Sequence, residues 1–360
     1  MKKRFLRDIA EIQTGPFGSQ LHKEDYVDVG TPIVTVEHLG CRVFSEQNLP
    51  MVSDTDKSRL SKYVLKKGDI VFSRVGSVDR CSFVDPKHDG WMFSGRCLRV
   101  RPSEEVDSLF LYYFFCLNTT KEFVRSIAVG ATMPSINTKL LGEVEVVCPE
   151  IEEQRKIADI LSKIDDKIEE NQKINENLEQ QAQAIYCDMF ITNANPSWQL
   201  GRLSDLIAVR YGKNHKKLAD GIYPVYGSGG IMRYAEKPLY DKESVLIPRK
   251  GTLNNVMYVN KPFWSVDTMF FTEMKLPNVA KFVFHFVKSK DLASLNAGSA
   301  VPSMTTDILN AMELSIPDAN TLYKFENIVA PMYQAMQQNT QQSSKLAELR
   351  DSLLPRLMSG

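Results

Sequence analysis

The 360-residue chain is long enough for about two domains, and its 43% hydrophobic and 24% charged residues are typical of a soluble globular protein. Lys and Arg together equal Asp and Glu at 44 each, so the chain lacks the positive excess that would let it hold DNA phosphate unaided. No stretch approaches the roughly 18 apolar residues of a membrane helix, and Asp8 and Glu11 interrupt any signal-peptide core. We therefore expect a cytoplasmic protein with no membrane partner. The six cysteines lack paired or metal-ligand spacing, so we also expect reduced thiols and no bound metal.

Residues 1–150 are predicted to form a mixed α/β domain of mostly short strands. Strand patterns occur at 32–36, 69–73 and 144–148, with turn signals between them. The apolar run at 109–117 is too short to span a membrane and is expected to be a helix buried in the core.

Two loops of this first domain have the chemistry expected for DNA contact. The glycine-rich loop at 15–20 lets backbone amides approach phosphate, and the loop at 74–77 follows a strand and combines a guanidinium with a hydroxyl group. Tight turns with solvated charges would contain the same residue types, so that interpretation stays open for any single loop. The candidate DNA-binding residues are Ser19, Gln20, Arg74, Ser77 and Arg80.

Residues 151–192 carry a heptad pattern over about five repeats, which predicts a coiled-coil helix. Apolar side chains fill both rows of the a/d seam, and asparagines lie at its centre, where they would fix the register. The outward positions are filled by Glu, Lys, Asp and Gln. The predicted seam residues are Ile157, Leu161, Ile164, Ile168, Asn171, Leu178 and Ile185.

Residues 193–317 predict a second α/β domain. Its strand patterns lie at 223–226, 244–247 and 257–259, and its core helix is expected at 279–287.

The loops of the second domain repeat the chemistry of the first. A glycine-rich loop at 226–230 and a strand-end loop at 249–255 supply hydroxyl, guanidinium and amide groups, and a basic cluster around His215 could follow phosphate or form a solvated face. Residues 191–317 hold 15 basic and 10 acidic side chains, whereas residues 151–190 hold 5 and 10. The candidate DNA-binding residues here are Lys213, Lys216, Lys217, Tyr226, Ser228, Arg249, Lys250, Thr252, Asn254 and Asn255.

Residues 318–360 predict a second coiled-coil helix with a weaker seam, because Ser343 and Arg350 interrupt the apolar rows. A helix of about 40 residues would be roughly 60 Å long, more than one domain needs. Two amphipathic helices, each lying on its own domain, are the alternative; we favour antiparallel pairing within the chain, as a rod between two heads with a pseudo-twofold axis. The predicted seam residues are Phe325, Val329, Met332, Met336, Asn339, Leu346 and Leu353.

The two halves of the chain are copies of one another. The segment 130–138 reappears at 298–306, and the same offset of about 168 residues places Asn171 on Asn339. A repeat this long indicates a duplicated domain rather than a solenoid. A duplicated recognition domain predicts a target that is read in two places.

The duplicated heads, the paired helices and several short motifs together resemble the specificity (S) subunits of type I restriction-modification systems. The motifs are GPFGS at 15–19, YGSGG at 226–230, FWSVDT at 263–268 and the strand-Arg-x-Gly loops. The resemblance extends over essentially the whole chain. It implies an α/β (α+β) fold with two tandem target recognition domains, each followed by a conserved helix of an antiparallel coiled coil.

The resemblance also implies a function and a set of partners. Each recognition domain would read one half of an asymmetric double-stranded DNA sequence, and the coiled coil would set the spacer and dock two modification subunits, with or without restriction subunits. The chain itself would be non-catalytic. The adenine-N6 methyltransferase and ATP-dependent endonuclease activities, with their AdoMet, ATP and Mg, would belong to the partner subunits.

Three other interpretations remain open on the residues alone. Asn195-Pro-Ser-Trp198 faintly resembles a methyltransferase motif, and Asp267 with Glu273 and Lys275 has the residue types of a metal-dependent nuclease. A coiled-coil adaptor whose heads bind protein is the third. No G-x-x-x-x-G-K-[ST] loop for ATP is present in the sequence.

Overall fold

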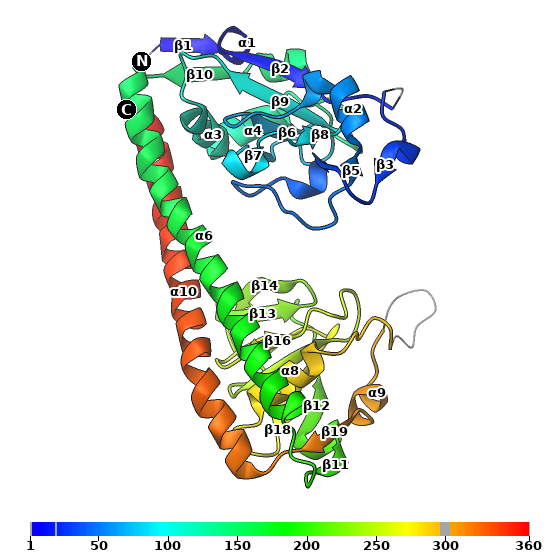
Figure 1. Cartoon of the computed structure of the whole chain (residues 1–360). Helices are drawn as coiled ribbons and strands as arrows, with labels where there is room; N and C mark the ends of the chain where they lie inside the picture. The colour runs from blue at the N-terminus through cyan, green and yellow to red at the C-terminus, as the bar shows by residue number, and fades with distance from the viewer. Residues whose placement is uncertain (1, 19, 296–302, 360) are drawn as a thin grey trace. The chain divides into compact units, whose positions relative to one another are not determined.

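The structure is a computed structural model that describes residues 2–18, 20–295 and 303–359 (Figure 1). No helix among these residues is long and apolar enough to cross a membrane. The six cysteines are free thiols, and three of them are buried.

The chain divides into two compact units, and each unit contains one globular head and a section of each of two long helices. The helices are α6 (Ile151–Cys187) and α10 (Ala319–Ser359). We refer to residues 2–148 as head 1 and to residues 199–316 as head 2. Unit 1 comprises residues 1–171 and 340–360, and unit 2 comprises residues 172–339.

A four-stranded antiparallel sheet in the order β2-β9-β6-β7 forms the centre of head 1. Helix α3 (Ser108–Cys116) packs on this sheet and is almost entirely apolar, and the six residues from Phe110 to Phe115 are buried. The carboxylate of Asp107 caps the helix by accepting hydrogen bonds from the amides of Leu109 and Phe110 at 3.1 and 2.9 Å. The strands are β2 (Ala10–Thr14), β6 (Ile70–Ser73), β7 (Cys81–Phe83) and β9 (Cys97–Pro102).

A second sheet in the order β3-β5-β4-β8 and a separate pair, β1-β10, complete head 1. Strands β4 and β8 run parallel, and the other pairs are antiparallel. The predicted strands at 32–36, 69–73 and 144–148 are confirmed as β4, β6 and β10. The remaining elements are β1 (Lys2–Phe5), β3 (Tyr26–Val27), β4 (Thr31–Val34), β5 (Met51–Val52), β8 (Met92–Phe93), β10 (Glu145–Cys148), α1 (Leu6–Ile9), α2 (Asp54–Arg59), α4 (Asn118–Ser126), α5 (Thr138–Gly142) and the 3-10 turns η1 (Lys23–Asp25), η2 (Val36–His38), η3 (Ser61–Tyr63) and η4 (Pro86–His88).

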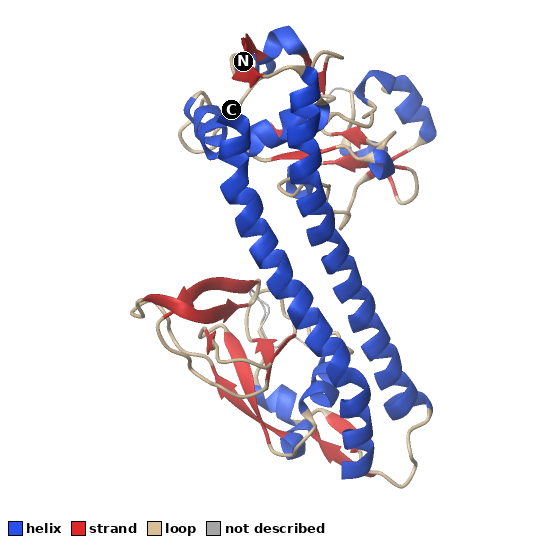
Figure 2. Ribbon diagram, turned by 90° about the vertical axis from the view of Figure 1, so that its left-hand side faces the viewer, coloured by secondary structure: helices blue, strands red, loops and turns tan. Residues whose placement is uncertain are grey.

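Head 2 repeats this plan. Its central antiparallel sheet has the order β12-β18-β15-β16, its second sheet has the order β14-β13-β17 with β13 and β17 parallel, and β11 pairs with β19. Figure 2 shows these strands in red, with the long helices in blue. The elements are β11 (Gln199–Arg202), α7 (Leu203–Leu206), β12 (Ile207–Tyr211), β13 (Asp220–Gly227), β14 (Gly230–Ala235), β15 (Ser244–Pro248), β16 (Met257–Val259), β17 (Trp264–Ser265), β18 (Met269–Met274), α8 (Ala280–Lys288), α9 (Thr306–Asn310) and β19 (Glu313–Ile316).

The repeat extends to single backbone contacts. The amide of Gly15 donates to the carbonyl of Cys97 at 3.2 Å in head 1, and that of Gly212 donates to Met269 at 3.0 Å in head 2. A Cβ atom at either glycine would lie 2.1 or 2.0 Å from a backbone oxygen of the facing loop, which is far inside van der Waals contact. Both positions therefore require glycine. The fold class expected from the sequence, two tandem α/β domains each followed by a long helix, is confirmed.

The two long helices pair in antiparallel fashion within unit 1. Moving forward along α6 from Asp165 to Asn171, the partner on α10 moves back from Arg350 to Ser343, with N–O distances of 2.7 and 3.2 Å. Ser343 and Arg350, expected to weaken the seam, thus form polar layers within it. Each has a polar partner on α6, and the weaker seam predicted for α10 stays a prediction.

The same pairing occurs within unit 2. The amide of Asn339 donates to the side-chain oxygen of Asn175 at 2.9 Å, and Asn175 donates to the carbonyl of Met336 at 3.2 Å. Beyond Cys187, α6 continues as a short π-helix, η5 (Asp188–Thr192). All predicted seam residues of both helices are buried or half-buried. Ile157 and Leu161 belong to the apolar core of head 1, and Phe325 and Val329 to that of head 2, so the seam assignment as a whole stays a prediction.

The ends of the long helices bury a second face that the heptad pattern did not predict. In unit 1, Ala158, Leu354 and Met358 belong to the same apolar core as α3, and in unit 2, Tyr186 and Tyr333 belong to the core around α8. The helices therefore pack on each other and on the heads. The alternative, in which each helix lies on its own domain, is thus also true of one face of each helix.

Candidate nucleic-acid interface

Two strand-end loops occupy equivalent places in the two heads. The loop after β6 begins at Arg74, and the loop after β15 begins at Arg249. The amide of Arg74 donates to the carbonyl of Arg96 and its own carbonyl accepts from Ile136, at 2.8 and 2.9 Å. The amide of Arg249 donates to Thr268 and its carbonyl accepts from Met304, at the same two distances. Two flanking loops therefore fix the backbone of each arginine in matching ways.

The two guanidinium groups also have matching surroundings. The Cζ atom of Arg74 lies over the ring of Phe17, 5.1 Å from its centroid, and Nη1 donates to the carbonyl of Gly95 at 3.1 Å. The Cζ atom of Arg249 lies over the ring of Tyr211 at 5.4 Å, and Nη1 donates to the carbonyl of Asp267 at 3.2 Å. Both arginines are half-buried. Each is held by one ring and one backbone oxygen.

The glycine-rich loop of head 2 contacts the strand-end loop. The amide group of Asn255 donates to the carbonyl of Ser228 at 2.7 Å. Gly251 has a φ of +87°, and a Cβ there would lie 2.8 Å from the Ser228 hydroxyl. Lys250 and Thr252 are exposed on the same loop. The structure therefore brings these candidates together.

Several candidate side chains are used inside the fold. Asn254 donates to Asp291 and accepts from the amide of Ala293, both at 3.0 Å, and its hydrogen bond to Asp291 holds the pKa of that carboxyl below its ordinary value. Tyr226 is buried against Phe263, and burial raises its pKa to about 12. Tyr226 supports its loop from within the head, and Asn254 holds its loop against residues 291–293 at the surface.

The other head 1 candidates are more scattered. Gln20 accepts a hydrogen bond from the hydroxyl of Tyr63 at 2.7 Å. Ser77 and Arg80 are exposed, and the Arg80 side chain passes beside Gly40. Ser19 lies outside the described residues.

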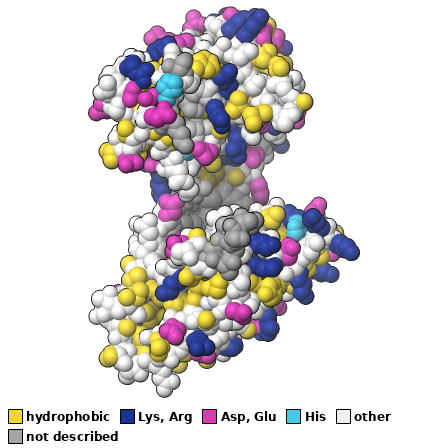
Figure 3. Space-filling model, turned by 90° about the vertical axis from the view of Figure 1, so that its right-hand side faces the viewer, with side chains coloured by type: hydrophobic (Ala, Val, Ile, Leu, Met, Phe, Trp, Pro, Cys, Tyr) yellow, Lys and Arg dark blue, Asp and Glu magenta, His cyan; other side chains and the backbone are white. Residues whose placement is uncertain are grey.

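The basic cluster of head 2 forms an exposed surface beside the loops. Lys213, Lys216 and Lys217 are all exposed, and the indole of Trp264 donates to the carbonyl of Lys213 at 2.8 Å. Figure 3 shows Lys and Arg side chains gathered on this face of unit 2. Such a surface suits phosphate, which lysine attracts as a point charge.

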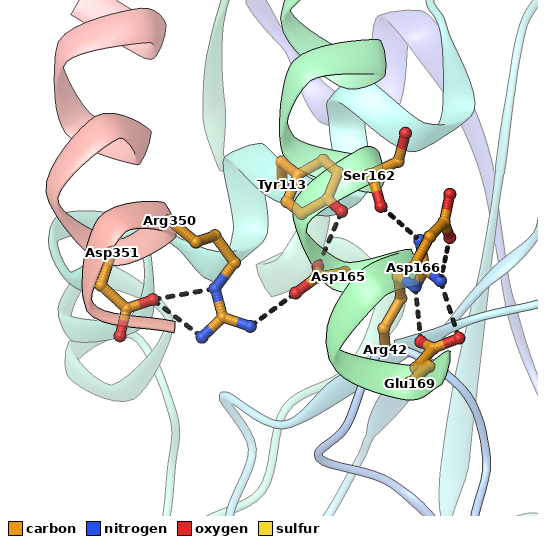
Figure 4. Close-up of polar contacts among 8 residues, drawn as sticks. All are labelled: Arg42, Tyr113, Ser162, Asp165, Asp166, Glu169, Arg350 and Asp351. Carbon is orange, nitrogen blue, oxygen red and sulfur yellow. Dashed lines mark hydrogen bonds and ion pairs between the residues drawn. The ribbon is translucent and has the colours of Figure 1, made fainter. Parts of the chain in front are cut away.

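A buried polar network joins head 1 to both long helices within unit 1 (Figure 4). The hydroxyl of Tyr113, from α3, donates to one carboxylate oxygen of Asp165 on α6, and Arg350 of α10 donates to the other, both at 2.7 Å. Arg350 also donates twice to Asp351, at 2.9 and 2.8 Å. Asp165, on α6, therefore connects helix α3 of the head with the other long helix, α10.

A loop of head 1 makes a second connection to α6. Arg42 donates through Nε to Glu169 at 2.8 Å and through Nη2 to Asp166 at 2.5 Å (Figure 4). Although burial opposes the charge, these carboxylates raise the pKa of Arg42 above its ordinary value. A third hydrogen bond reaches the carbonyl of Ser162 at 3.4 Å.

Unit 2 makes the equivalent connection with uncharged groups. His285 of α8 holds the place that Tyr113 has in α3, and Tyr333 of α10 corresponds to Asp165 of α6 by the sequence repeat. The Tyr333 hydroxyl lies 2.9 Å from Nε2 of His285, and Nδ1 lies 2.7 Å from the side-chain oxygen of Gln183. Burial, with a contribution from Lys288, lowers the pKa of His285 to about 4. A neutral imidazole fits both contacts, donating from Nδ1 and accepting at Nε2.

This histidine predicts a pH dependence of stability. The folded pKa of about 4 lies below the unfolded value of 6.5, so the unfolded chain binds the extra proton between these values. The contribution of His285 to the free energy of unfolding is therefore fully present above pH 6.5. It falls by about 3 kcal/mol as the pH drops towards 4. We expect hydrogen exchange of α8 amides to show this loss, and His285→Gln to reduce its steepness. An identical pH profile in the wild type and the variant would contradict the assignment.

Several of the residues suggested for catalysis are engaged in structural contacts. Glu273 forms an ion pair with Arg210 at 2.9 Å, and Lys275 donates to the carbonyl of Ser204 at 2.6 Å. Asn195 accepts hydrogen bonds from Ser197, and Trp198 donates to Asp318 at 3.2 Å near the start of α10. The described residues contain no group of His, Cys, Asp and Glu arranged to hold a metal ion.

The comparisons with known proteins agree with this architecture. The family described as "Type I restriction modification DNA specificity domain" matches residues 1–180 and 195–343. The MjaIX specificity subunit of Methanocaldococcus jannaschii, a type I restriction enzyme subunit, is 27% identical to this chain, with 72% of the chain and 70% of that protein aligned. The HindI specificity subunit of Haemophilus influenzae is 22% identical, with 91% and 92% aligned. The crystal structure of a type I S subunit from M. genitalium superposes with a TM-score of 0.60 at 19% identity, covering 99% of this chain and 95% of that one.

Proposed function

The chain belongs to the type I restriction-modification DNA specificity family, and from this premise we propose that head 1 and head 2 each read one half of a bipartite, asymmetric DNA target. The observation that supports the proposal is the repeated frame. Both heads hold an arginine at the same strand end, on the same backbone contacts. The side chains around it differ, because Val75 and Gly95 in head 1 correspond to Lys250 and Asp267 in head 2. Equal frames with unequal side chains suit two different half-sites.

Two heads give more discrimination than one. A head of this size contacts only a few base pairs, and each mismatched base pair costs about 1–3 kcal/mol, roughly additively for separate positions. The net charge of zero leaves the chain with little phosphate affinity of its own. Partner subunits that contact DNA would supply the remaining affinity.

The long helices are the natural docking element and spacer. They are 37 and 41 residues long, and their buried seam is interrupted by polar layers that fix its register. We propose that two modification subunits bind along this coil, and that restriction subunits join them in some assemblies. Methylation and cleavage, with AdoMet, ATP and Mg, then take place on those partners, and this chain selects the sequence.

Exchange of head 2 tests the modular proposal. Strands β11 and β19 pair with each other, with Gln199 opposite Ile316, so a graft can enter and leave the head at adjacent positions. Replacing residues 199–316 by the second head of another family member is expected to change one half of the methylated sequence and leave the other half unchanged. The measurement is sequencing of methylated bases in cells that also express the modification subunit.

A matched control carries only the junction changes of this graft and should retain the original sequence. A change in both halves, or in neither half when the complex is shown to assemble, would contradict independent reading by the two heads.

A further inference from the structure

The aromatic rings at the matching arginine sites come from different sequence positions in the two heads. Gly15 and Gly212 are equivalent, yet the ring in head 1 comes two residues after its glycine, from Phe17, and the ring in head 2 comes one residue before its glycine, from Tyr211. Sequence duplication alone would therefore not place both rings over the arginine. The shared geometry indicates a shared requirement on the guanidinium.

Both rings lie at the surface. Phe17 is 51% exposed and Tyr211 is 52% exposed, although aromatic side chains of this size are usually buried. The Cζ atom of each arginine lies over its ring, 5.1 and 5.4 Å from the ring centroid. An exposed ring stacked on an arginine restricts the side chain while leaving its edge open to a ligand.

The hydrogen bonds leave part of each guanidinium available. Among the described residues, the side chains of Arg74 and Arg249 each make one hydrogen bond, through Nη1 to a backbone carbonyl, and neither forms an ion pair. The Nε and Nη2 groups are then the donors left for a ligand. Paired donors in one plane match the two acceptors, O6 and N7, that guanine presents in the major groove.

We propose that Arg74 in head 1 and Arg249 in head 2 are the paired base-reading residues of this protein, each binding the O6 and N7 edge of one guanine in its own half-site. This inference rests on the proposed function. A phosphate contact would gain little from a fixed orientation, since the exposed lysines of head 2 can supply it as mobile charges. A ring and a carbonyl that orient the guanidinium are useful when its donors must align with the planar edge of a base.

The neighbouring residues explain how one arginine can serve two different half-sites. Lys250 follows Arg249, and the carbonyl that orients Arg249 belongs to Asp267; the corresponding residues in head 1 are Val75 and Gly95. These two positions carry a cation and a carboxylate in head 2, and an apolar residue and a glycine in head 1. The guanine is common to both half-sites, and its neighbours differ.

Replacing arginine by lysine keeps the positive charge and removes the paired donors of the planar guanidinium. In the complex with the modification subunit, we expect Arg249→Lys to reduce discrimination at one guanine of the head 2 half-site by about tenfold or more, because a bidentate pair contributes about 1–3 kcal/mol. Arg74→Lys is expected to do the same in the other half-site only. Arg210→Lys and Arg125→Lys are matched controls, since these exposed arginines pair with Glu273 and Asp79 on the same two heads.

Modified DNA tests the contacted atom directly. Replacing the guanine by 7-deazaguanine removes N7, and this should weaken binding by the wild type and have little further effect on Arg249→Lys. Tyr211→Leu and Phe17→Leu should each reduce the same discrimination, because they release the guanidinium. Binding that is weakened equally on all sequences, with a smaller salt dependence, would mean a phosphate contact and would overturn the proposal.

The outcome is separable from that of the proposed function. If exchange of head 2 alters one half-site but Arg249→Lys retains full guanine discrimination, the heads read DNA through other residues and only this inference fails. If head exchange alters nothing, the proposed function itself fails.

Discussion

Arg350→Ala is expected to destabilise unit 1 by about 3 kcal/mol, because it leaves the buried carboxylate of Asp165 without its cation. Asp165 has a side-chain exposure of 7%, so its carboxylate depends on protein partners more than on solvent. The Tyr113 hydroxyl remains as a donor at 2.7 Å but carries no charge. Hydrogen exchange of the α3 amides measures this loss within unit 1, without requiring two-state unfolding of the whole chain.

A double variant shows whether the loss is due to the stranded charge. Asp165→Asn with Arg350→Met removes both charges and leaves an oxygen that can accept from Tyr113. Replacing a buried ion pair by neutral groups is often close to neutral in stability, so we expect the loss to fall below about 1 kcal/mol. Arg356→Ala, an exposed arginine on the same helix, is the control and should change little. Equal destabilisation by Arg350→Ala and Arg356→Ala would contradict the account.

Deletion of one heptad from each long helix is expected to change the distance between the half-sites. Residues 168–174 and 340–346 are the heptads centred on Asn171 and Ser343, which are in contact, so their joint removal preserves the seam period. Each helix becomes shorter by about 10 Å. At 3.4 Å per base pair, we expect a spacer about three base pairs shorter, or loss of methylation.

A length-preserving variant provides the comparison. Alanine at the exposed positions Lys173 and Glu176 alters the same region without changing the seam or the length, and should retain the original spacer. An unchanged spacer after the heptad deletion, with both half-sites still methylated, would show that the coil does not set the spacing.

The long helices were predictable because their burial repeats with a short period. Seam residues such as Leu161 and Val329 recur every three or four positions, and this pattern is visible without knowledge of the rest of the fold. The core helices α3 and α8 were equally predictable from continuous apolar runs. The glycine-rich loops were visible from composition, although the reason for glycine at Gly15 is the close approach of the Ser94 carbonyl.

The polar connections between heads and helices could not be predicted in this way. Arg42 lies in an irregular loop, and its contact with Glu169 joins residues 127 positions apart. The only local signal was Arg350, a cation in an apolar seam that requires an acidic partner. The sequence repeat also masks the relation, since Asp165 corresponds to Tyr333 and the two units make the same connection with different chemistry.

The arginine sites were only partly visible in the sequence. Arg74 and Arg249 were selected as strand-end residues, and they remain predicted DNA contacts. Their rings were not found, because Phe17 and Tyr211 occupy different positions relative to the shared glycine. Tyr226 and Asn254 were selected by residue type, and the structure uses both within the loops. Residue type identifies donors and acceptors, whereas only the fold shows which of them are already engaged.

Sequencing of methylated bases in genomic DNA, from a host that expresses this chain with its modification subunit, tests the central claim most directly. The account predicts a two-part methylated sequence with a fixed spacer, present with the chain and absent without it. Methylation that persists unaltered without the chain, or without intact heads in a complex shown to assemble, would contradict it. The heads would then not select the target, and a protein-binding adaptor would become the better interpretation.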